Sequence, residues 1–110
     1  MWRGWTEKQN ADAYDAYLNE ELFPRLYREL RASGYRGFHV LRLARGDEVE
    51  FVTLVWFESR EAVRSFAGAN YETPVISPEA RHLLSRYSDR CEHYDLSGFQ
   101  LAEQPESSRI

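Results

Sequence analysis

The sequence predicts one α+β domain, in which an antiparallel sheet of about four strands carries its helices on one face. Three observations predict it: an apolar run that suits a strand buried on both faces, a leucine repeat of helical period, and turn signals that separate the remaining strands. With 110 residues, the chain has room for a single core and one domain.

The segment from Phe51 to Phe57 is almost entirely apolar and is rich in β-branched and aromatic residues, which is typical of a central strand. Ser59 follows it and can cap a helix whose apolar positions recur at helical spacing up to Phe66. Gly68 supplies the expected left-handed stop of that helix. The sequence therefore predicts a strand that leads directly into a helix.

This central strand presents apolar side chains to both faces of the sheet, because neighbouring residues of a strand point in opposite directions. Leu54 and Trp56 lie on one face, whereas Val55 and Phe57 lie on the other. The few helices of so short a chain cover only one face. We therefore expect a second copy of the chain to cover the other face, in a homodimer.

The N-terminal half predicts a strand followed by a long helix. Trp2 to Thr6 alternates as a short strand, and Thr6 stands at capping distance from Gln9. Leucines at four-residue spacing then mark one face of a helix, which Pro24 is expected to kink or restart. Ser33 and Gly34 end the helical region.

The remaining segments complete an alternation of strands and helices. Tyr35 to Ala44 predicts a strand, and the turn at 45–48 joins it to the central strand as a hairpin. Ser77 and Pro78 begin a helix that is expected to reach Tyr87, and residues 90–96 form the last strand. The order is that of a ferredoxin-like split βαβ fold over residues 1–97, with a polar tail over residues 98–110.

Composition narrows the range of partners and compartments. The formal net charge of −4 arises from scattered residues of both signs, so we expect neither nucleic acid nor a membrane as partner. Cys91 is the single cysteine and cannot form an internal disulfide. We therefore expect a cytoplasmic protein.

Short motifs spread along the chain resemble the antibiotic biosynthesis monooxygenase family. They include Trp2-Arg3-Gly4, Ala11-Asp12-Ala13-Tyr14, Tyr35-Arg36-Gly37, Gly46-Asp47-Glu48, Trp56 with Glu58-Ser59, Phe66-Ala67-Gly68 and His93-Tyr94. The resemblance implies a dimeric α+β barrel, in which two sheets face each other. It also implies oxidation of a small phenolic, quinol or anthrone-like molecule by dioxygen, with no cofactor.

Two other functions stay open. Thr53, Phe57 and Val63 stand where aromatic-polyketide oxygenases of the family carry an Asn, a Trp and a Tyr. Phe66 and Ile76 stand where its haem-degrading members carry a Trp and a His. The alternative is therefore a non-enzymatic protein that binds a small molecule, and haem binding or degradation is a third reading.

A cofactor-free oxygenase needs a base, an aromatic pocket and protection from water. Histidine is the natural base, so we expect His93, or else His39, to be catalytic. The expected pocket walls are aromatic, namely Tyr14, Tyr17, Trp56, Phe66, Tyr71 and Tyr94. Cys91 and His93 provide only two potential metal ligands, so no metal site is expected.

Overall fold

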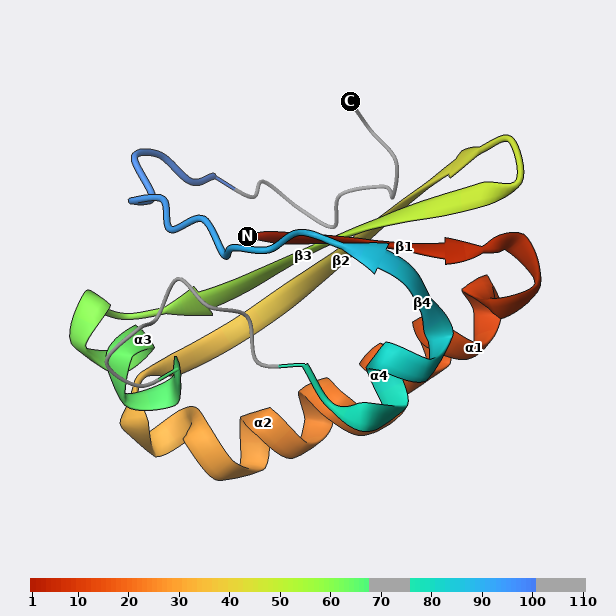
Figure 1. The fold of residues 1–110 in the computed structure, drawn as a ribbon. Helices are drawn as coiled ribbons and strands as arrows, with labels where there is room; N and C mark the ends of the chain where they lie inside the picture. The colour runs from red at the N-terminus through yellow and green to blue at the C-terminus, as the bar shows by residue number, and fades with distance from the viewer. Residues whose placement is uncertain (68–75, 101–110) are drawn as a thin grey trace.

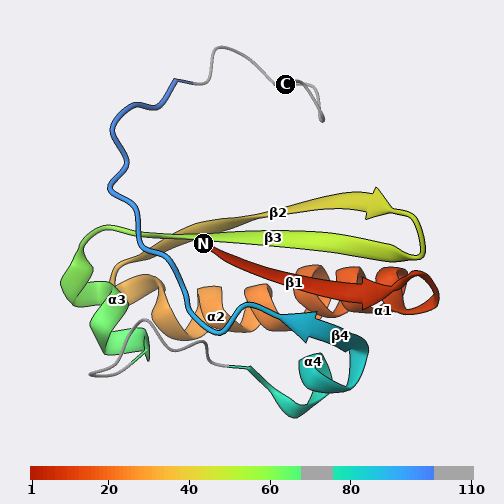
Figure 2. The ribbon, with the colours of Figure 1, turned by 45° about the horizontal axis from the view of Figure 1, so that its top comes forward.

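The computed structural model describes residues 1–67 and 76–100. Four strands form one antiparallel sheet in the order β2-β3-β1-β4. Their bounds are β1 Trp2–Glu7, β2 Tyr35–Arg45, β3 Glu48–Phe57 and β4 Leu84–Tyr87. Figure 1 labels the four strands, and Figure 2 shows their order, with β3 and β1 at the centre. The predicted α+β class and the ferredoxin-like strand order are confirmed.

The hairpin between β2 and β3 follows the predicted turn. Arg45 pairs with Glu48, and Gly46 between them has a φ of 63°, which suits glycine in a tight turn. The pairing continues to Tyr35 opposite Phe57, and the register shifts between Tyr35 and Gly37. This bulge inserts one residue into β2 near the end of the central strand.

The helical region begins later than the capping pattern predicted. β1 continues to Glu7, so Thr6 stays in the sheet as a fully buried strand residue and does not cap a helix. A 3-10 turn, η1 (Lys8–Asn10), precedes α1 (Ala11–Ala16). The capping prediction was wrong because pairing of β1 with both β3 and β4 extends through Thr6.

Pro24 modifies the helix as expected. A π-helical turn, η2 (Tyr17–Leu22), separates α1 from α2 (Phe23–Leu30), and Pro24 lies in the first turn of α2. Proline lacks an amide hydrogen and collides with the carbonyl four residues earlier, so a widened turn accommodates it. The 3-10 turn η3 (Arg31–Ser33) then ends at Gly34, whose φ is 104°.

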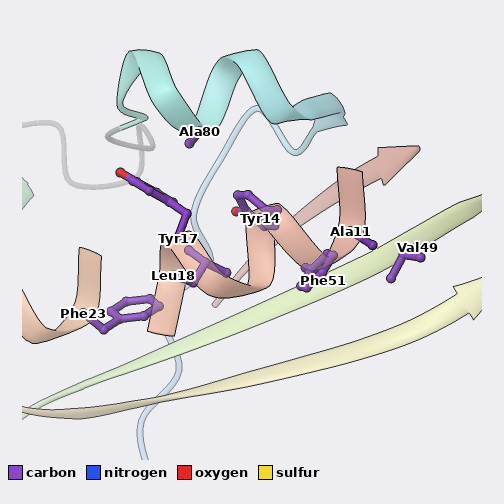
Figure 3. Close-up of a cluster of buried hydrophobic side chains, with 8 residues drawn as sticks. All are labelled: Ala11, Tyr14, Tyr17, Leu18, Phe23, Val49, Phe51 and Ala80. Atoms are coloured by element: carbon purple, nitrogen blue, oxygen red, sulfur yellow. The ribbon is translucent and has the colours of Figure 1, made fainter. Parts of the chain in front are cut away.

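The helices cover one face of the sheet, as Figure 2 shows. The core between them consists of buried residues from the helices and from alternate positions of β3 (Figure 3): Ala11, Tyr14, Tyr17, Leu18, Phe23, Val49, Phe51 and Ala80. Tyr14 meets Phe51 edge to face, with ring centroids 4.9 Å apart. Trp56 and Leu54 lie on the other face, as predicted, which we call the open face because no described helix covers it.

The helices after β3 have the predicted starts. The Ser59 side chain accepts a hydrogen bond from the Ala62 amide at 3.2 Å at the start of α3 (Arg60–Ala67). Ser77 accepts one from the Ala80 amide at 3.1 Å at the start of α4 (Pro78–Leu83). The predicted stop at Gly68 lies outside the described residues.

The last strand lies earlier in the chain than the sequence predicted. The strand is Leu84–Tyr87, where the sequence predicted the end of a helix, and residues 88–100 form no strand. Ser88 and Glu92 still donate amide hydrogen bonds to the carbonyls of Arg3 and Met1, at 2.9 Å each. These hydrogen bonds are isolated, so residues 88–92 run beside the start of β1 without forming a regular strand.

Candidate ligand pocket at the end of the central strand

The last part of β3 has a neighbouring strand on one side only. β1 pairs with β3 as far as Trp2 opposite Thr53, whereas β2 continues alongside β3 to Phe57. Within the described chain, the edge of residues 54–57 therefore faces Met1, α3 and the segment that follows β4. A hollow of about 530 Å³ lies along this edge, a volume within the range of small-molecule sites.

The hollow has a largely apolar and aromatic lining. Residues of both sheet faces line it, because it lies beside the edge of the strand. Val63 and Phe66 of α3 form one side, and the ring of Phe66 lies 5.7 Å from that of Phe57. The other lining residues are Met1, Trp2, Thr53, Leu54, Val55, Trp56, Glu58, Ser59, Arg60, Cys91, Glu92, His93, Tyr94, Asp95 and Leu96.

Residues 88–96, which we call the wall segment, close one side of the hollow without forming regular secondary structure. The Trp2 indole donates to the Ser88 carbonyl at 2.9 Å, and the Met1 ammonium donates to the Glu92 carbonyl at 2.6 Å. The wall segment is therefore attached to β1 along its first half. Figure 2 shows it passing the N-terminus toward the open face of the sheet.

His93 is carried by the wall segment and lines the hollow, where it is partly buried. Cys91 and Tyr94 lie beside it. Burial raises the pKa of the Cys91 thiol, which keeps the thiol protonated and weakens it as a nucleophile. The Tyr94 hydroxyl donates to Glu92 at 3.1 Å, and this carboxylate raises the pKa of Tyr94. Histidine is the most frequent general base in enzymes, so the imidazole is the candidate base among these groups.

Trp56 connects the hollow to the open face of the sheet. Its indole nitrogen donates a hydrogen bond to Nδ1 of His39 at 2.7 Å, and the two rings meet edge to face at 86°. His39 is exposed and does not line the hollow. The two histidines predicted to be catalytic therefore have different surroundings, since His93 lines the hollow and His39 contacts one of its walls.

Four of the predicted site residues come together at the hollow: Trp56, Phe66, His93 and Tyr94. Tyr14 and Tyr17 do not. Both are buried in the helical core (Figure 3). The Tyr17 hydroxyl lies 2.6 Å from the Ser77 hydroxyl. Their helical spacing is a core pattern in this structure, and neither residue lines the hollow. Tyr71 lies outside the described residues.

Arg60 and Leu96 contribute to the hollow but were missed by the sequence analysis. A signal for the hollow was present, because the predicted first strand of five residues is shorter than the apolar run from Phe51 to Phe57. An unequal pair of strands leaves part of the longer edge unpaired. The side chains that gather at this edge depend on the path of residues 88–96, which the sequence pattern did not reveal.

Arg42 lies on the helix-covered face, where it pairs with Asp15 at 2.9 Å and with Asp12 at 3.2 Å. Glu50 lies on the open face and pairs with Arg45 at 3.1 Å. In residues 1–67 and 76–100, no group of three His, Cys, Asp or Glu side chains could hold a metal ion. No described helix is long and apolar enough to cross a membrane.

The fold and the hollow together define a ferredoxin-like α+β protein with an aromatic-lined pocket at the end of its central strand. Comparison of the chain with protein-family models, with curated proteins and with solved structures gives no match.

Proposed function

We propose that this protein binds a small phenolic, quinol or anthrone-like molecule in the hollow beside β3 and oxidises it with dioxygen without a cofactor. The observation that carries the proposal is the convergence of His93 with Trp56, Phe66 and Tyr94, which come from three distant parts of the chain. Aromatic walls suit a planar ring, and an imidazole suits removal of a proton. The motifs that resemble antibiotic biosynthesis monooxygenases support the same chemistry.

The proposed reaction balances without an external reductant. For an anthrone, His93 accepts a proton from the ring carbon, and the carbanion passes one electron to dioxygen. The resulting radical and superoxide combine through a new carbon–oxygen bond, and the peroxide takes up a proton. Cleavage of the oxygen–oxygen bond and loss of a second ring proton then release water and leave a quinone carbonyl. One oxygen atom enters the product and the other enters water.

Oxygen uptake by metal-stripped protein tests the proposal, with a panel of anthrones, quinols and catechols as substrates. Loss of a general base lowers catalysis by about a hundred-fold or more, so His93→Ala should lose most of the uptake. His82→Ala is the matched control, because His82 is exposed on α4 and does not line the hollow. Uptake that is equal in all three proteins would remove His93 from the mechanism.

Reversible binding without chemistry is a second candidate function. The side chain of Tyr94 is exposed, and the wall segment also borders a more open hollow of about 680 Å³ that includes His93. An oxygenase has to exclude water from its carbanion, whereas a carrier or sensor has no such requirement. Saturable quenching of tryptophan fluorescence by these aromatic compounds, without oxygen uptake, would favour this function.

We also propose that two copies pair through the open face and that the protein acts in a reducing cytoplasm. Leu41 and Leu43 are 49% and 51% exposed on that face, beside Val52 and Leu54 of β3. Apolar side chains in adjacent rows favour contact with a second sheet. The ion pairs Arg3–Glu50, Arg45–Glu50 and Arg86–Glu48 form the polar end of the same face.

A further inference from the structure

We propose that the unpaired backbone of Val55 and Phe57 binds a hydroxyl group of the substrate, so that the hollow prefers hydroxylated rings to the corresponding ethers and quinones. This inference rests on the proposed function and narrows its substrate class to rings with a free hydroxyl group, hydroxylated anthrones included. Both residues line the hollow. Neither has a partner strand on that side within the described chain, because pairing of β1 with β3 ends with Trp2 opposite Thr53.

The direction of these backbone groups follows from the alternation of an antiparallel sheet, in which successive residues of a strand form hydrogen bonds with opposite neighbours. The Glu58 amide, immediately after β3, donates to the Gly34 carbonyl beside β2 at 2.8 Å. At the other end of β3, the Asp47 carbonyl accepts from the Lys8 amide, which follows β1, at 3.0 Å. Even-numbered residues of β3 therefore face β2, whereas odd-numbered residues face β1 or, beyond its end, the hollow.

Val55 and Phe57 therefore present two amide donors and two carbonyl acceptors to the hollow. A ring hydroxyl can accept from an amide and donate to a carbonyl at the same time, because it has lone pairs and a proton. A quinone carbonyl or a methyl ether only accepts, and it leaves the backbone carbonyls without a partner. A buried carbonyl without a partner costs affinity, so the substrate should bind more tightly than its quinone product.

The surroundings of this edge suit a flat ring that carries hydroxyl groups. The apolar residues Val63 and Phe66 line the hollow on one side, and the wall segment lines it on the other. Apolar surroundings lower the local dielectric constant and strengthen a hydrogen bond to the backbone. Val55 and Phe57 are about 7 Å apart along the strand, so a fused-ring molecule with two hydroxyl groups can reach both.

Naphthol and its methyl ether, methoxynaphthalene, form a matched pair of ligands that differ in one hydrogen-bond donor. In a purely apolar hollow, the added methyl group would make the ether bind at least as tightly as naphthol. The inference predicts the opposite order, with naphthol tighter by about five-fold or more, because its proton satisfies a backbone carbonyl. Calorimetric titration of the full chain measures both affinities.

Nuclear magnetic resonance of nitrogen- and carbon-labelled protein locates the contact. In the free protein, amide hydrogen exchange should be faster at Val55 and Phe57 than at Leu54 and Trp56, because only the latter pair faces β2. Naphthol should slow this exchange and shift the backbone carbonyl signal at Val55 or Phe57. Leu54 and Trp56 are the matched internal control, since they also line the hollow but their backbone groups face β2.

The expected result combines fast exchange at Val55 and Phe57, its slowing by naphthol, and tighter binding of naphthol than of the ether. Exchange at these two residues that is as slow as at Leu54 and Trp56 in the free protein would overturn the inference, because the edge would then be covered. Equal affinity for the two ligands, or naphthol binding that changes neither backbone signal, would overturn the inference and leave the proposed function standing. Absence of binding by either ligand would contradict the proposed function and the inference with it.

Discussion

Arg60, the first residue of α3, pairs with Asp95 of the wall segment at a distance of 3.3 Å. The pair joins the helix on one side of the hollow to the segment on its other side. Both side chains are well exposed, so the pair contributes between zero and about 1 kcal/mol to the free energy of unfolding. Its expected effect is therefore on the position of the wall segment more than on global stability.

Arg60→Ala should leave the melting temperature almost unchanged and weaken naphthol binding by up to about five-fold. Calorimetric titration measures the affinity, and thermal denaturation measures the stability. Arg86→Ala is the matched control, because Arg86 also forms a surface ion pair, with Glu48, and neither of these residues lines the hollow. Equal loss of affinity in both variants would show that the effect comes from net charge and not from the wall segment.

Tyr35→Phe should leave the protein as stable as wild type, or more stable by about 1 kcal/mol. The Tyr35 hydroxyl is buried, and the described part of the chain offers it no hydrogen-bond partner. Tyr17→Phe should instead lose about 1 kcal/mol, because it removes the hydrogen bond to Ser77. Urea denaturation of both variants compares the two. Greater destabilisation by Tyr35→Phe would reveal a partner for its hydroxyl.

The fold should lose stability in alkaline solution. Burial raises the pKa of Tyr35 to about 12 and raises that of Tyr14 even further above the ordinary tyrosine value. The folded protein thus holds these protons more tightly than the unfolded chain does. Stability should be constant below about pH 10 and fall as the pH rises toward the folded-state values. Urea denaturation in this range should show a smaller loss in Tyr35→Phe.

Gly34→Ala should destabilise the protein by about 2 kcal/mol or more. Gly34 has a φ of 104°, and an added Cβ would lie 2.7 Å from the Cβ of Ala62. Gly46→Ala is the matched control, because Gly46 also has a positive φ but has no atom near its added Cβ. That variant should lose only about 1 kcal/mol, the cost of a left-handed alanine. Urea denaturation measures both losses of stability. Equal losses in the two variants would show that α3 moves away from the added methyl group of residue 34 at no cost in free energy.

The double variant Leu41→Glu and Leu43→Glu should dissociate the proposed dimer, because it introduces charge into the apolar part of the open face. Sedimentation velocity should give a dimer for wild type and a monomer for the variant. Tyr27→Glu is the control, since Tyr27 is equally exposed but belongs to α2 on the opposite side of the sheet. A monomeric wild-type protein would contradict the pairing.

The sequence predicted the strand order and faces because side-chain alternation and turn chemistry are local signals. Val55 and Trp56 show this, since their opposite directions follow from adjacency alone. The chain after α4 could not be predicted in the same way. Leu84 and Tyr87 fit a helical repeat, yet their segment pairs with Gly4 in the sheet. Backbone pairing with a distant strand overrode the local pattern.

The sequence predicted only part of the candidate site, because local patterns place some of its residues and not others. Trp56 and Phe66 come from a strand and a helix whose limits are visible in the sequence, and both reach the hollow. Tyr14 and Tyr17 carry the same kind of side chain but face the core. Residue type cannot separate the two sets. The separation depends on where β1 ends beside β3, which only the assembled sheet determines.

Product analysis after a single turnover under isotopically labelled dioxygen tests the central claim most directly. Metal-stripped wild-type protein and an anthrone should give a quinone with one labelled oxygen atom. The His93→Ala variant should form this quinone at a rate lower by about a hundred-fold or more. A product without label, or one formed equally fast by His93→Ala, would contradict oxidation by dioxygen with His93 as the base.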